Sequence, residues 1–282
     1  MTDRPRVALA TFRGFPELWE DDAVLLPALR EVGVDAEPAV WDDAGVDWTR
    51  FDLVVVRSTW DYVPRREEFL AWARSLPAVA NPADVLSWNT EKTYLRGLAA
   101  AGVPVVPTSW LRPGDRYSPP TGEHVVKPTI SANAADTARY AEGEDSTPHV
   151  QRLLADGRDV MVQPYLARID EQGETAVVFV EGEVSHAARK APVLVPDLAD
   201  PEDVAITPCT ATDQELVLAR RAVAALPFAE PLLYARVDLV PGPDGTPVLL
   251  ELELAEPSLF LTTADGAVER LASAIAGRVQ AG

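Results

Sequence analysis

Apolar and polar positions follow two different periods along the first eighty residues. Short apolar runs at residues 6–11, 34–40 and 51–56 predict buried strands, and the last is rich in β-branched valine. Residues 21–32 and 67–76 instead carry apolar side chains at helical spacing. Strands that alternate with helices indicate βαβ units and a parallel sheet. Because ligands meet such sheets at the carboxyl ends of the strands, the loops after residues 11 and 56 are candidate binding loops.

Beyond residue 88 the pattern predicts one helix followed by strands and hairpins. Asn89 or Thr90 is the expected N-cap of a helix that runs to Gly102, which would place Lys92 in its first turn. Apolar runs predict the further strands, the last four as two hairpins: residues 102–107, 124–128, 160–166, 176–180 with 184–190, and 234–240 with 248–254. The chain is therefore an α/β (α+β) protein whose second part is rich in hairpins.

Composition restricts the classes of protein that remain. The chain has 282 residues, of which 47% are hydrophobic and 24% charged, as in a globular protein of about two domains. It has no apolar run of membrane-spanning length, its first six residues do not resemble a signal peptide, and its single cysteine, Cys209, excludes an internal disulfide. We therefore expect a cytoplasmic protein. The net charge of −19 argues against nucleic-acid and membrane partners, because those surfaces select basic proteins.

Only three of the 25 basic residues are lysines, namely Lys92, Lys127 and Lys190. A lysine in a chain that otherwise uses arginine suggests a place where a compact point charge is needed, as in contacts to single phosphate oxygens. The stretch 129–137 that follows Lys127 is small and rich in hydroxyl groups, and its backbone amides are suited to covering phosphates. Three such cations predict a nucleoside triphosphate, although lysines scattered over a solvated surface remain the alternative.

The loop at residues 57–62 is the richer of the two candidate loops near the N-terminus. Arg57 directly follows the buried strand, where it can bind a substrate carboxylate, and Asp61 can meet an amino group of the same molecule. The alternatives are that Trp60 and Tyr62 only pack the loop onto the sheet, and that Asp61 forms a salt bridge with Arg57.

The strand at residues 160–166 and the acids beyond it predict a place for a nucleoside. Met161, Val162 and Leu166 would form an apolar slot for an aromatic base. A carboxylate farther on, Glu174 or Asp170, would bind the ribose hydroxyls. In the alternative interpretation both acids lie in a solvated hairpin loop.

The most informative acids lie near the C-terminus. Arg236 and Asp238 share one face of a strand, because side chains two residues apart point the same way. A turn-rich segment, 241–247, leads to a second strand with Glu251 and Glu253 at alternate positions. A hairpin would gather the three carboxylates, which repel one another unless a cation neutralises them. All-oxygen ligation predicts Mg²⁺ held by these carboxylates and by substrate phosphates.

With these motifs in this order, the chain resembles the ATP-grasp superfamily of carboxylate–amine ligases, and the resemblance runs through essentially its whole length. The resemblance implies that Lys92 and Lys127 bind the phosphates of ATP. It implies that Glu174, or less favourably Asp170, binds the ribose. The hinge that clasps adenine falls on Gln163, Tyr165 and Leu166.

The resemblance also implies a catalytic centre. Lys190 matches a basic residue that meets the phosphates or the acyl group, and Arg236 would hold developing charge at the acyl centre. Asp238, Glu251 and Glu253 match the family's metal ligands, with Glu253 standing where the family has Asn. A substrate carboxylate would attack the γ-phosphate to give an acyl phosphate and ADP, and an amine would then displace phosphate.

Within the superfamily, residues 57–62, 89–92 and 185–190 most resemble the branch that contains the cyclo-ligase of D-cycloserine biosynthesis. The implied architecture is a pre-ATP-grasp domain at 1–90 and an ATP-grasp domain at 91–282. The latter divides into a central lid at about 105–165 and a C-terminal subdomain at about 166–282.

We expect a small amino-acid-like substrate that contacts Arg57, Asp61, His186 and Ser258, with His186 more favourably interpreted as a structural or substrate-shaping residue. A homodimer is the assembly considered. Two other functions stay open: a phosphotransferase that uses the same ATP site, and a non-catalytic nucleotide-binding regulator, which the intact set of acids disfavours.

Overall fold

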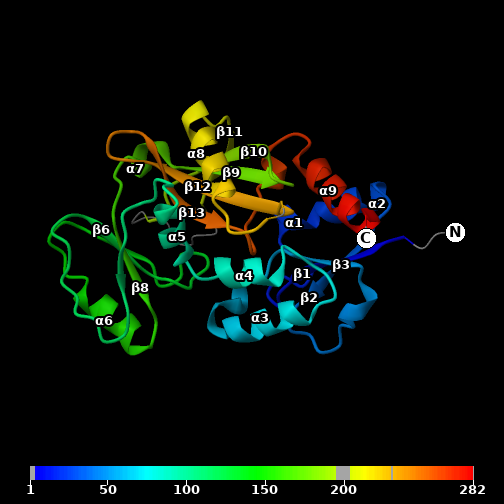
Figure 1. The fold of residues 1–282 in the computed structure, drawn as a ribbon, viewed down its shortest axis with the longest axis horizontal. Helices are drawn as coiled ribbons and strands as arrows, with labels where there is room; N and C mark the ends of the chain where they lie inside the picture. The colour runs from blue at the N-terminus through cyan, green and yellow to red at the C-terminus, as the bar shows by residue number, and fades with distance from the viewer. Residues whose placement is uncertain (1–3, 195–203, 230, 282) are drawn as a thin grey trace.

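The protein is described by a computed structural model that covers residues 4–194, 204–229 and 231–281, and it contains three sheets (Figure 1). The N-terminal sheet is parallel with strand order β2-β1-β3-β4. Its strands are β1 (Arg6–Thr11), β2 (Asp35–Val40), β3 (Leu53–Val56) and β4 (Val79–Ala80). Its helices and 3₁₀ turns are α1 (Glu20–Ala23), α2 (Leu25–Glu31), η1 (Trp48–Arg50), η2 (Trp60–Arg65), α3 (Arg66–Ser75) and α4 (Ala83–Asn89). The predicted parallel βαβ arrangement is confirmed.

The second sheet, here called the lid sheet, is antiparallel with strand order β5-β8-β6-β7. Its elements are β5 (Ser109–Leu111), β6 (His124–Pro128), β7 (Ala138–Tyr140), α6 (Thr147–Ala155) and β8 (Val160–Pro164). Side chains of α6 pack on β6 and β8 to form a small core of their own, which includes Val126, Val150 and Leu153. The lid sheet occupies one end of the molecule, at the left of Figure 1.

The third and largest sheet, the central sheet, has strand order β11-β10-β9-β12-β13 and is antiparallel. Its strands are β9 (Glu174–Val180), β10 (Glu183–Lys190), β11 (Ile206–Cys209), β12 (Tyr234–Pro241) and β13 (Pro247–Glu253). The surrounding helical segments are α5 (Tyr94–Ala100), α7 (Ile169–Gln172), α8 (Asp213–Ala224), η4 (Leu261–Thr263) and α9 (Ala267–Ala281). Both predicted hairpins, β9–β10 and β12–β13, are confirmed.

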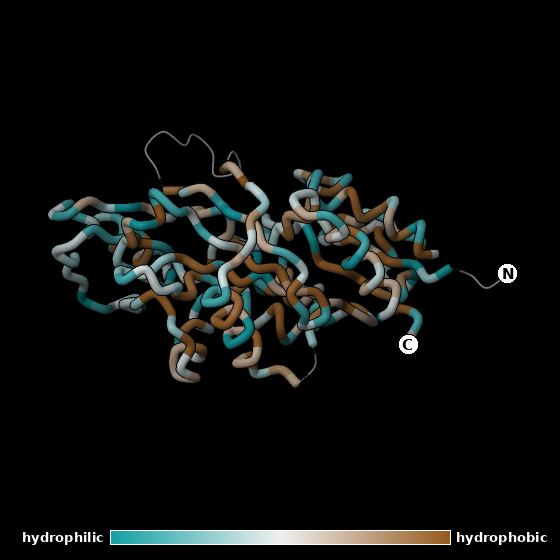
Figure 2. The backbone as a smooth tube through the Cα atoms, turned by 90° about the horizontal axis from the view of Figure 1, so that it is seen from above, coloured by the Kyte–Doolittle hydropathy of each residue, from teal (hydrophilic) through white to brown (hydrophobic). Residues whose placement is uncertain are grey.

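Strand β9 is buried on both faces, and its alternate residues belong to two different cores. Val178 and Val180 join the cluster that contains residues of α9 and of the N-terminal sheet, whereas Val177 and Phe179 join the cluster that contains residues of α5 and α8. This is the pleat alternation of a strand with one core on each side. The N-terminal sheet and the central sheet therefore share a core, and hydrophobic segments run through the middle of the molecule in Figure 2.

Asn81 joins these two sheets through hydrogen bonds. Its amide nitrogen donates to the carbonyls of Tyr234 and Leu254 at 2.9 and 2.8 Å, and its amide oxygen accepts from the backbone N–H of Leu233 at 2.8 Å. The side chain is fully buried, so each of these bonds satisfies a group that water cannot reach.

The predicted helix from Asn89 or Thr90 to Gly102 is wrong at its start. Helix α4 ends at Asn89, Thr90 is its C-cap and α5 begins only at Tyr94, so Lys92 lies in the connection between two helices. The reason is a distant partner. Asn89 donates to the Leu252 carbonyl at 2.7 Å and accepts from the Leu254 N–H at 2.6 Å, which ties the end of α4 to β13.

Two other predicted elements differ in detail. The predicted helix at 21–32 is two helices, α1 and α2, separated at Val24. The predicted strand at 102–107 forms only a bridge, in which Val105 pairs in parallel with Leu249 at the edge of the central sheet. No helix within residues 4–194, 204–229 and 231–281 combines the length and the apolar character needed to cross a membrane.

Candidate active site

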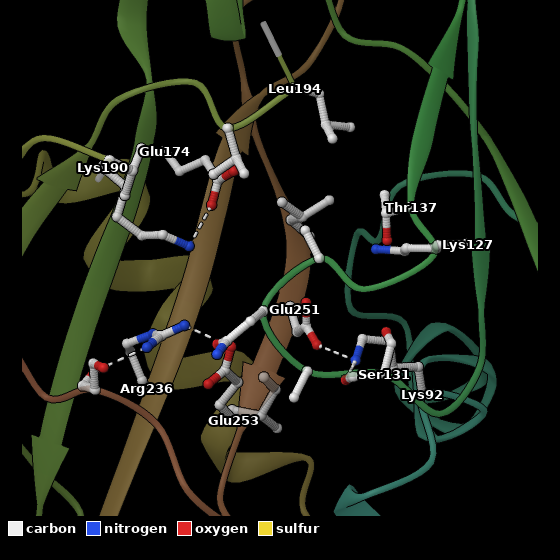
Figure 3. A pocket seen from close by; sticks show the side chains of 18 of the residues that line it. Lys92, Lys127, Ser131, Thr137, Glu174, Lys190, Leu194, Arg236, Glu251 and Glu253 are labelled. Atoms are coloured by element: carbon white, nitrogen blue, oxygen red, sulfur yellow. Dashed lines mark hydrogen bonds and ion pairs between the residues drawn. The ribbon is translucent and has the colours of Figure 1, made fainter. Parts of the chain in front are cut away.

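A cavity of about 550 Å³ lies where the three sheets meet. The lid sheet contributes Lys127 and Gln163, the central sheet contributes Lys190 and Arg236, and the segment after β3 contributes Trp60. The volume falls within the range of small-molecule sites. Figure 3 shows the cavity between the strands of the central sheet and those of the lid sheet.

All three lysines of the chain line this one cavity, although they come from three separate segments. Lys127 lies on β6, Lys190 ends β10 and Lys92 precedes α5. Arg236 on β12 adds a fourth cation. Lys92 and Lys127 are each only 8% exposed. Four largely buried cations therefore gather around one cavity, in a chain whose net charge is −19.

Lys127 is the cation best placed to receive a ligand. Within the described ranges, its ammonium group makes neither a hydrogen bond nor an ion pair, and it points into the cavity near Thr137 (Figure 3). Burial lowers its pKa, and the charges of Lys92 and Lys190 lower it further while Glu251 acts in the opposite direction. A phosphate oxygen would supply the missing counter-charge.

We expect Lys127→Met to weaken ATP binding about tenfold or more, because a buried charge-assisted contact to phosphate is lost. We expect Lys127→Arg to restore only part of the affinity, since a planar fork does not replace a point charge in a buried position. Calorimetric titration with ATP measures both effects. Arg220→Met, which removes an exposed cation from the surface pair with Glu183, is the matched control. Normal ATP affinity in both Lys127 variants would contradict this role.

Lys92 is held by two partners. Its ammonium contacts Glu251 at 2.8 Å and donates to the Ser131 carbonyl at 2.8 Å. Burial alone would lower its pKa, but the carboxylate of Glu251 outweighs this effect and raises it. The contact to Ser131 connects Lys92 to the loop after β6, in which Asn133 and Ala134 have positive φ and line the cavity with Ser131. The loop predicted to cover phosphates therefore borders the same space as the lysines.

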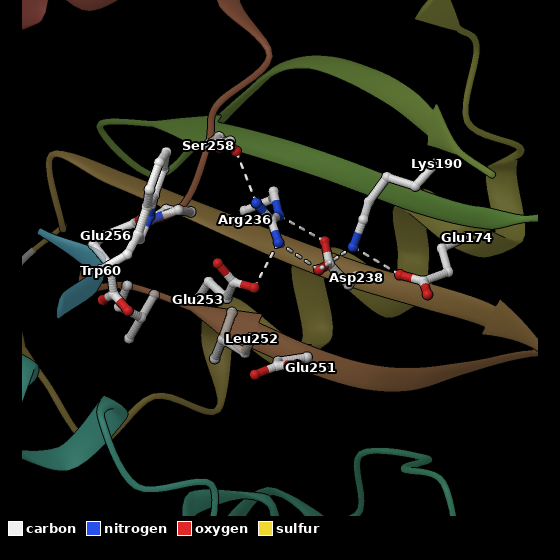
Figure 4. Close-up of polar contacts among 12 residues, drawn as sticks. Trp60, Glu174, Lys190, Arg236, Asp238, Glu251, Leu252, Glu253, Glu256 and Ser258 are labelled. Carbon is white, nitrogen blue, oxygen red and sulfur yellow. Dashed lines mark hydrogen bonds and ion pairs between the residues drawn. The ribbon is translucent and has the colours of Figure 1, made fainter. Parts of the chain in front are cut away.

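The acids of β12 and β13 lie on adjacent strands. Arg236 pairs in register with Glu253, and Asp238 pairs with Glu251. Arg236 Nε and Nη2 contact the two oxygens of Asp238 at 2.8 Å each, and Nη2 also reaches Glu253 at 2.5 Å (Figure 4). Lys190 bridges from Asp238 at 3.5 Å to Glu174 at 2.9 Å. Each of these acids is thus paired with a basic residue.

These pairs set the protonation of the acids. Burial would raise the pKa of Asp238, but Arg236 and Lys190 together lower it to about 2. Burial raises the pKa of Glu253, Arg236 opposes this effect, and the charges of Asp238 and Glu251 add to it, so that the pKa is about 7. Negative charge is therefore compensated at Asp238 and under-compensated at Glu253.

The prediction that Asp238, Glu251 and Glu253 gather into one metal site is not met in this arrangement. Within residues 4–194, 204–229 and 231–281, no three acidic, histidine or cysteine side chains are close enough together to hold a metal ion. The physical reason is that Arg236 and Lys190 take both oxygens of Asp238 and Lys92 takes Glu251. The donor set still fits Mg²⁺, which needs only one or two carboxylates beside substrate phosphates. The charge of Glu253, which Arg236 compensates only in part, is one that such a cation would stabilise.

The apolar part of the cavity differs from the predicted slot. Leu166 lines the cavity, as do Gln163 and Tyr165 of the predicted hinge, but Met161 and Val162 do not. Met161 is buried in the core cluster that includes residues of α5, and Val162 packs in the core of the lid. The residues that line the cavity in their place are Val106, Val125, Ile169 and Leu250.

Of the two candidate ribose acids, Glu174 lines the cavity and Asp170 does not. Asp170 accepts a hydrogen bond from Tyr165 Oη at 2.5 Å and pairs with Arg139 at 3.1 Å. Arg139 also lies over the Tyr165 ring at 3.5 Å, so Asp170 fixes the hinge from outside. The assignment of Asp170 to ribose is corrected, and Glu174 is retained.

Arg57 lies outside the cavity lining, which contradicts its predicted contact with substrate. The side chain is fully buried, with Nε bonded to Asp22 at 2.8 Å and Nη2 bonded to the Pro257 carbonyl at 2.5 Å. Its guanidinium also lies 4.9 Å from the centre of the Tyr234 ring. Arg57 therefore links the N-terminal sheet to the segment after β13.

Asp61 and His186 also lie outside the cavity lining. Asp61 accepts from Trp41 Nε1 at 2.8 Å and pairs with Arg65 at 2.5 Å, so the considered salt bridge to Arg57 is absent as well. His186 donates from Nε2 to the Leu259 carbonyl at 2.8 Å, in keeping with the structural interpretation. Ser258 does line the cavity.

Sequence reasoning missed Glu256, which lines the cavity beside Trp60 and Tyr62. Its signal was an acid three residues beyond the end of an apolar, acid-bearing strand and directly before Pro257. Trp60 and Tyr62, considered as packing residues, line the cavity and also pack in aromatic clusters. The predicted packing role is therefore confirmed, and a contact with substrate remains a prediction.

Comparison with known proteins gives consistent results. The family described as the N-terminal domain of D-cycloserine synthetase DcsG matches residues 7–83. The cycloserine biosynthesis protein DcsG of Streptomyces lavendulae is 40% identical over 277 residues, which covers 91% of this chain and 93% of that protein. The crystal structure of D-cycloserine synthetase DcsG superposes with a TM-score of 0.89 at 38% identity, covering 97% of this chain and 99% of that one.

A more distant structure shares the fold. The ATP-grasp ligase PsnB, solved with a minimal precursor, Mg and ADP, superposes with a TM-score of 0.64 at 18% identity, covering 99% of each chain. At this identity the similarity concerns the fold alone.

Proposed function

We propose that this chain, which belongs to the D-cycloserine synthetase branch of the ATP-grasp ligases, closes an amino acid on itself to form the D-cycloserine ring. The predicted ATP-grasp fold and carbon–nitrogen ligase activity are confirmed by this membership, and the chain uses a nucleotide. The observation that carries the proposal is the 40% identity to DcsG over nearly the whole chain, together with a cavity that is lined by all three lysines.

The chemistry follows from the carboxylate–amine ligase class. A carboxylate oxygen of the substrate attacks the γ-phosphorus of ATP, the bond to the bridging oxygen breaks and ADP leaves. The nitrogen nucleophile of the same molecule then attacks the acyl carbon, phosphate leaves and the nitrogen loses a proton. The net change is a new C–N bond and the loss of one water from the amino acid, balanced by conversion of ATP to ADP and phosphate.

The residues divide this work by position. Lys92 and Lys127 would bind the nucleotide phosphates. Lys190, at the end of β10, would stabilise the transferring phosphoryl group from the side of the central sheet. Arg236 is oriented by Asp238, Glu253 and the Ser258 carbonyl, so its guanidinium is held before substrate arrives. It would stabilise negative charge at the acyl centre without reorganising.

The nucleoside would occupy the part of the cavity bordered by the hinge. Gln163 donates to Thr108 at 2.9 Å, which orients its amide, while Tyr165 and Leu166 contribute apolar surface for the base. Glu174 would bind the ribose hydroxyls after its contact with Lys190 opens.

Mg²⁺ would be held by Glu251 and Glu253 with phosphate oxygens, and would supply charge neutralisation at the γ-phosphate. Asp238 would join this set only by giving up one of its bonds to Arg236 or Lys190.

We expect a single amino acid with a second nitrogen on its side chain to support phosphate release from ATP without any other acceptor. The experiment incubates the protein with ATP, Mg²⁺ and single D- and L-amino acids of this kind, and follows free phosphate and product mass. The expected product is lighter by one water, together with any other group that leaves. A phosphorylated product without free phosphate would instead indicate a phosphotransferase. A requirement for a second amino acid would contradict the intramolecular reaction.

A further inference from the structure

The segment after β13 is held by an unusual series of hydrogen bonds. Five consecutive backbone carbonyls, those of residues 255–259, each accept from a different side chain. In order, the donors are Tyr234 Oη at 2.8 Å, Trp60 Nε1 at 3.0 Å, Arg57 Nη2 at 2.5 Å, Arg236 Nη1 at 2.8 Å and His186 Nε2 at 2.8 Å. Asp21 then accepts from the backbone N–H groups of residues 261 and 262 at 3.1 Å each. Residues 255–262 are here called the clamped segment.

The donors come from the N-terminal part of the chain and from two strands of the central sheet. A backbone that is held in this way keeps one geometry without help from a ligand, and a fixed geometry favours selective binding. Only some side chains of the clamped segment line the cavity. The polar ones among them are Glu256, Ser258 and Thr262. Glu256 is the one that carries charge.

Glu256 lacks a basic partner. Within residues 4–194, 204–229 and 231–281, no lysine, arginine or histidine nitrogen lies within 4.0 Å of its carboxylate, in contrast to Asp238, Glu251 and Glu253. The hydroxyl of Tyr62 interacts with it, and Trp60 binds its carbonyl. Burial, followed by the charge of Glu253, raises the pKa of Glu256 to about 7. A carboxylate in this setting is short of positive charge.

The walls around Glu256 are aromatic. Trp19, Trp60 and Tyr62 line this end of the cavity, and the Trp19 and Trp60 rings lie 5.9 Å apart in an edge-to-face arrangement. A carboxylate beside aromatic faces suits an ammonium group, which gains an ion pair and cation–π attraction together. Phosphate or carboxylate groups would be repelled at this end.

We infer that Glu256 binds the ammonium group of the amino-acid substrate and so determines both its class and its direction in the cavity. This inference rests on the proposed function. In Figure 4 Trp60 and Glu256 lie at one end of the site, Arg236 and Glu253 lie next to them, and Lys190 and Glu174 lie at the other end. An amino acid with its ammonium at Glu256 therefore directs its carboxylate toward Arg236 and the lysines.

The test uses D-cycloserine and 3-isoxazolidinone, which is the same ring without the amine, as binding probes. Each is titrated by calorimetry into the full chain loaded with ADP at neutral pH. We expect the unaltered protein to bind D-cycloserine at least about tenfold more tightly than 3-isoxazolidinone, because only D-cycloserine carries the amine that makes a charged contact. Glu256→Gln should remove this preference and leave the ADP affinity unchanged, whereas Glu256→Asp, which keeps the charge, should retain part of the preference.

Glu17→Gln removes an exposed acid from the connection between β1 and α1 and serves as the control for net charge; it should keep the full preference. Thermal unfolding of each variant shows whether it folds. If Glu256→Gln does not fold, Tyr62→Phe replaces it in the test: this variant removes the hydroxyl beside Glu256 and should reduce the preference for D-cycloserine. A Glu256→Gln protein that binds ADP and still prefers the amine overturns the assignment of Glu256 alone. An unaltered protein that binds ADP but neither ring overturns the proposed product, and this inference with it.

Discussion

Glu251→Gln is expected to lower the rate of ATP-dependent phosphate release about 100- to 1,000-fold, because it weakens charge stabilisation at the transferring phosphoryl group. Glu251 pairs with Lys92 at 2.8 Å and lies opposite Asp238 in the register of β12 and β13. The amide keeps the shape of the side chain but removes the negative charge that both Lys92 and a divalent cation require. Measurement of phosphate release with the proposed class of substrate tests this directly.

A second measurement separates the loss of metal from the loss of fold. The Mg²⁺ concentration needed for half-maximal ATP binding should rise in Glu251→Gln, while its thermal unfolding stays close to that of the unaltered protein. Glu183→Gln, at an exposed acid that faces Arg220, is the matched control and should leave both values unchanged. Phosphate release at the normal rate by a folded Glu251→Gln protein would refute the role of Glu251 in holding the cation.

Arg57→Met is expected to destabilise the fold by about 3–5 kcal/mol, because it leaves the Asp22 carboxylate buried without its cation. Asp22 is 1% exposed, and its remaining partner is the hydroxyl of Ser58 at 2.6 Å. The same change frees the Pro257 carbonyl, so the clamped segment loses one of its five side-chain donors. The free energy of unfolding in urea measures the effect.

The control for Arg57 is another arginine that pairs with acids. Arg65 bonds Asp42 and Asp61, but its side chain is 34% exposed, so Arg65→Met should cost about 1 kcal/mol or less. In the double variant Arg57→Met with Asp22→Asn, much of the lost stability should return, since the buried charge is gone. If Arg57→Met were as stable as the unaltered protein but bound amino-acid substrate poorly, the direct contact predicted from sequence would be correct after all.

The elements that local pattern specifies were predictable from sequence. Strands β1 and β3 and the two hairpins β9–β10 and β12–β13 follow from apolar runs and turn residues, which act over a few positions. The common location of the three lysines could be predicted as well, because their scarcity among 25 basic residues is visible in composition alone. The roles of the site residues remain predictions.

The errors arose where a partner lies far away along the chain. Asn89 is a residue type that is favoured at N-caps, but its side chain bonds the backbone of residues 252 and 254, and it ends a helix. Arg57 follows a strand at the edge where ligands bind, yet Asp22 and Pro257 enclose it. Contacts over such separations depend on how sheets pack, which periodicity along the chain does not encode. The boundary between the two domains at residue 90 was inferred from the sequence alone, and it remains a prediction.

Asn81 has a mechanical consequence. By bonding both β12 and the residue after β13, and with a core shared across the same boundary, it joins the N-terminal and central sheets into one stiff body. The lid sheet has a separate core, and the chain enters it after α5 and leaves it after β8. Displacement of the lid would bend these two connections and shift Met161 of β8, which packs in the cluster of α5 and the central sheet, whereas the clamped segment would not move with it. The amino acid would bind to the N-terminal and central sheets, which do not move relative to each other, whereas the triphosphate would lie between the central sheet and the lid sheet.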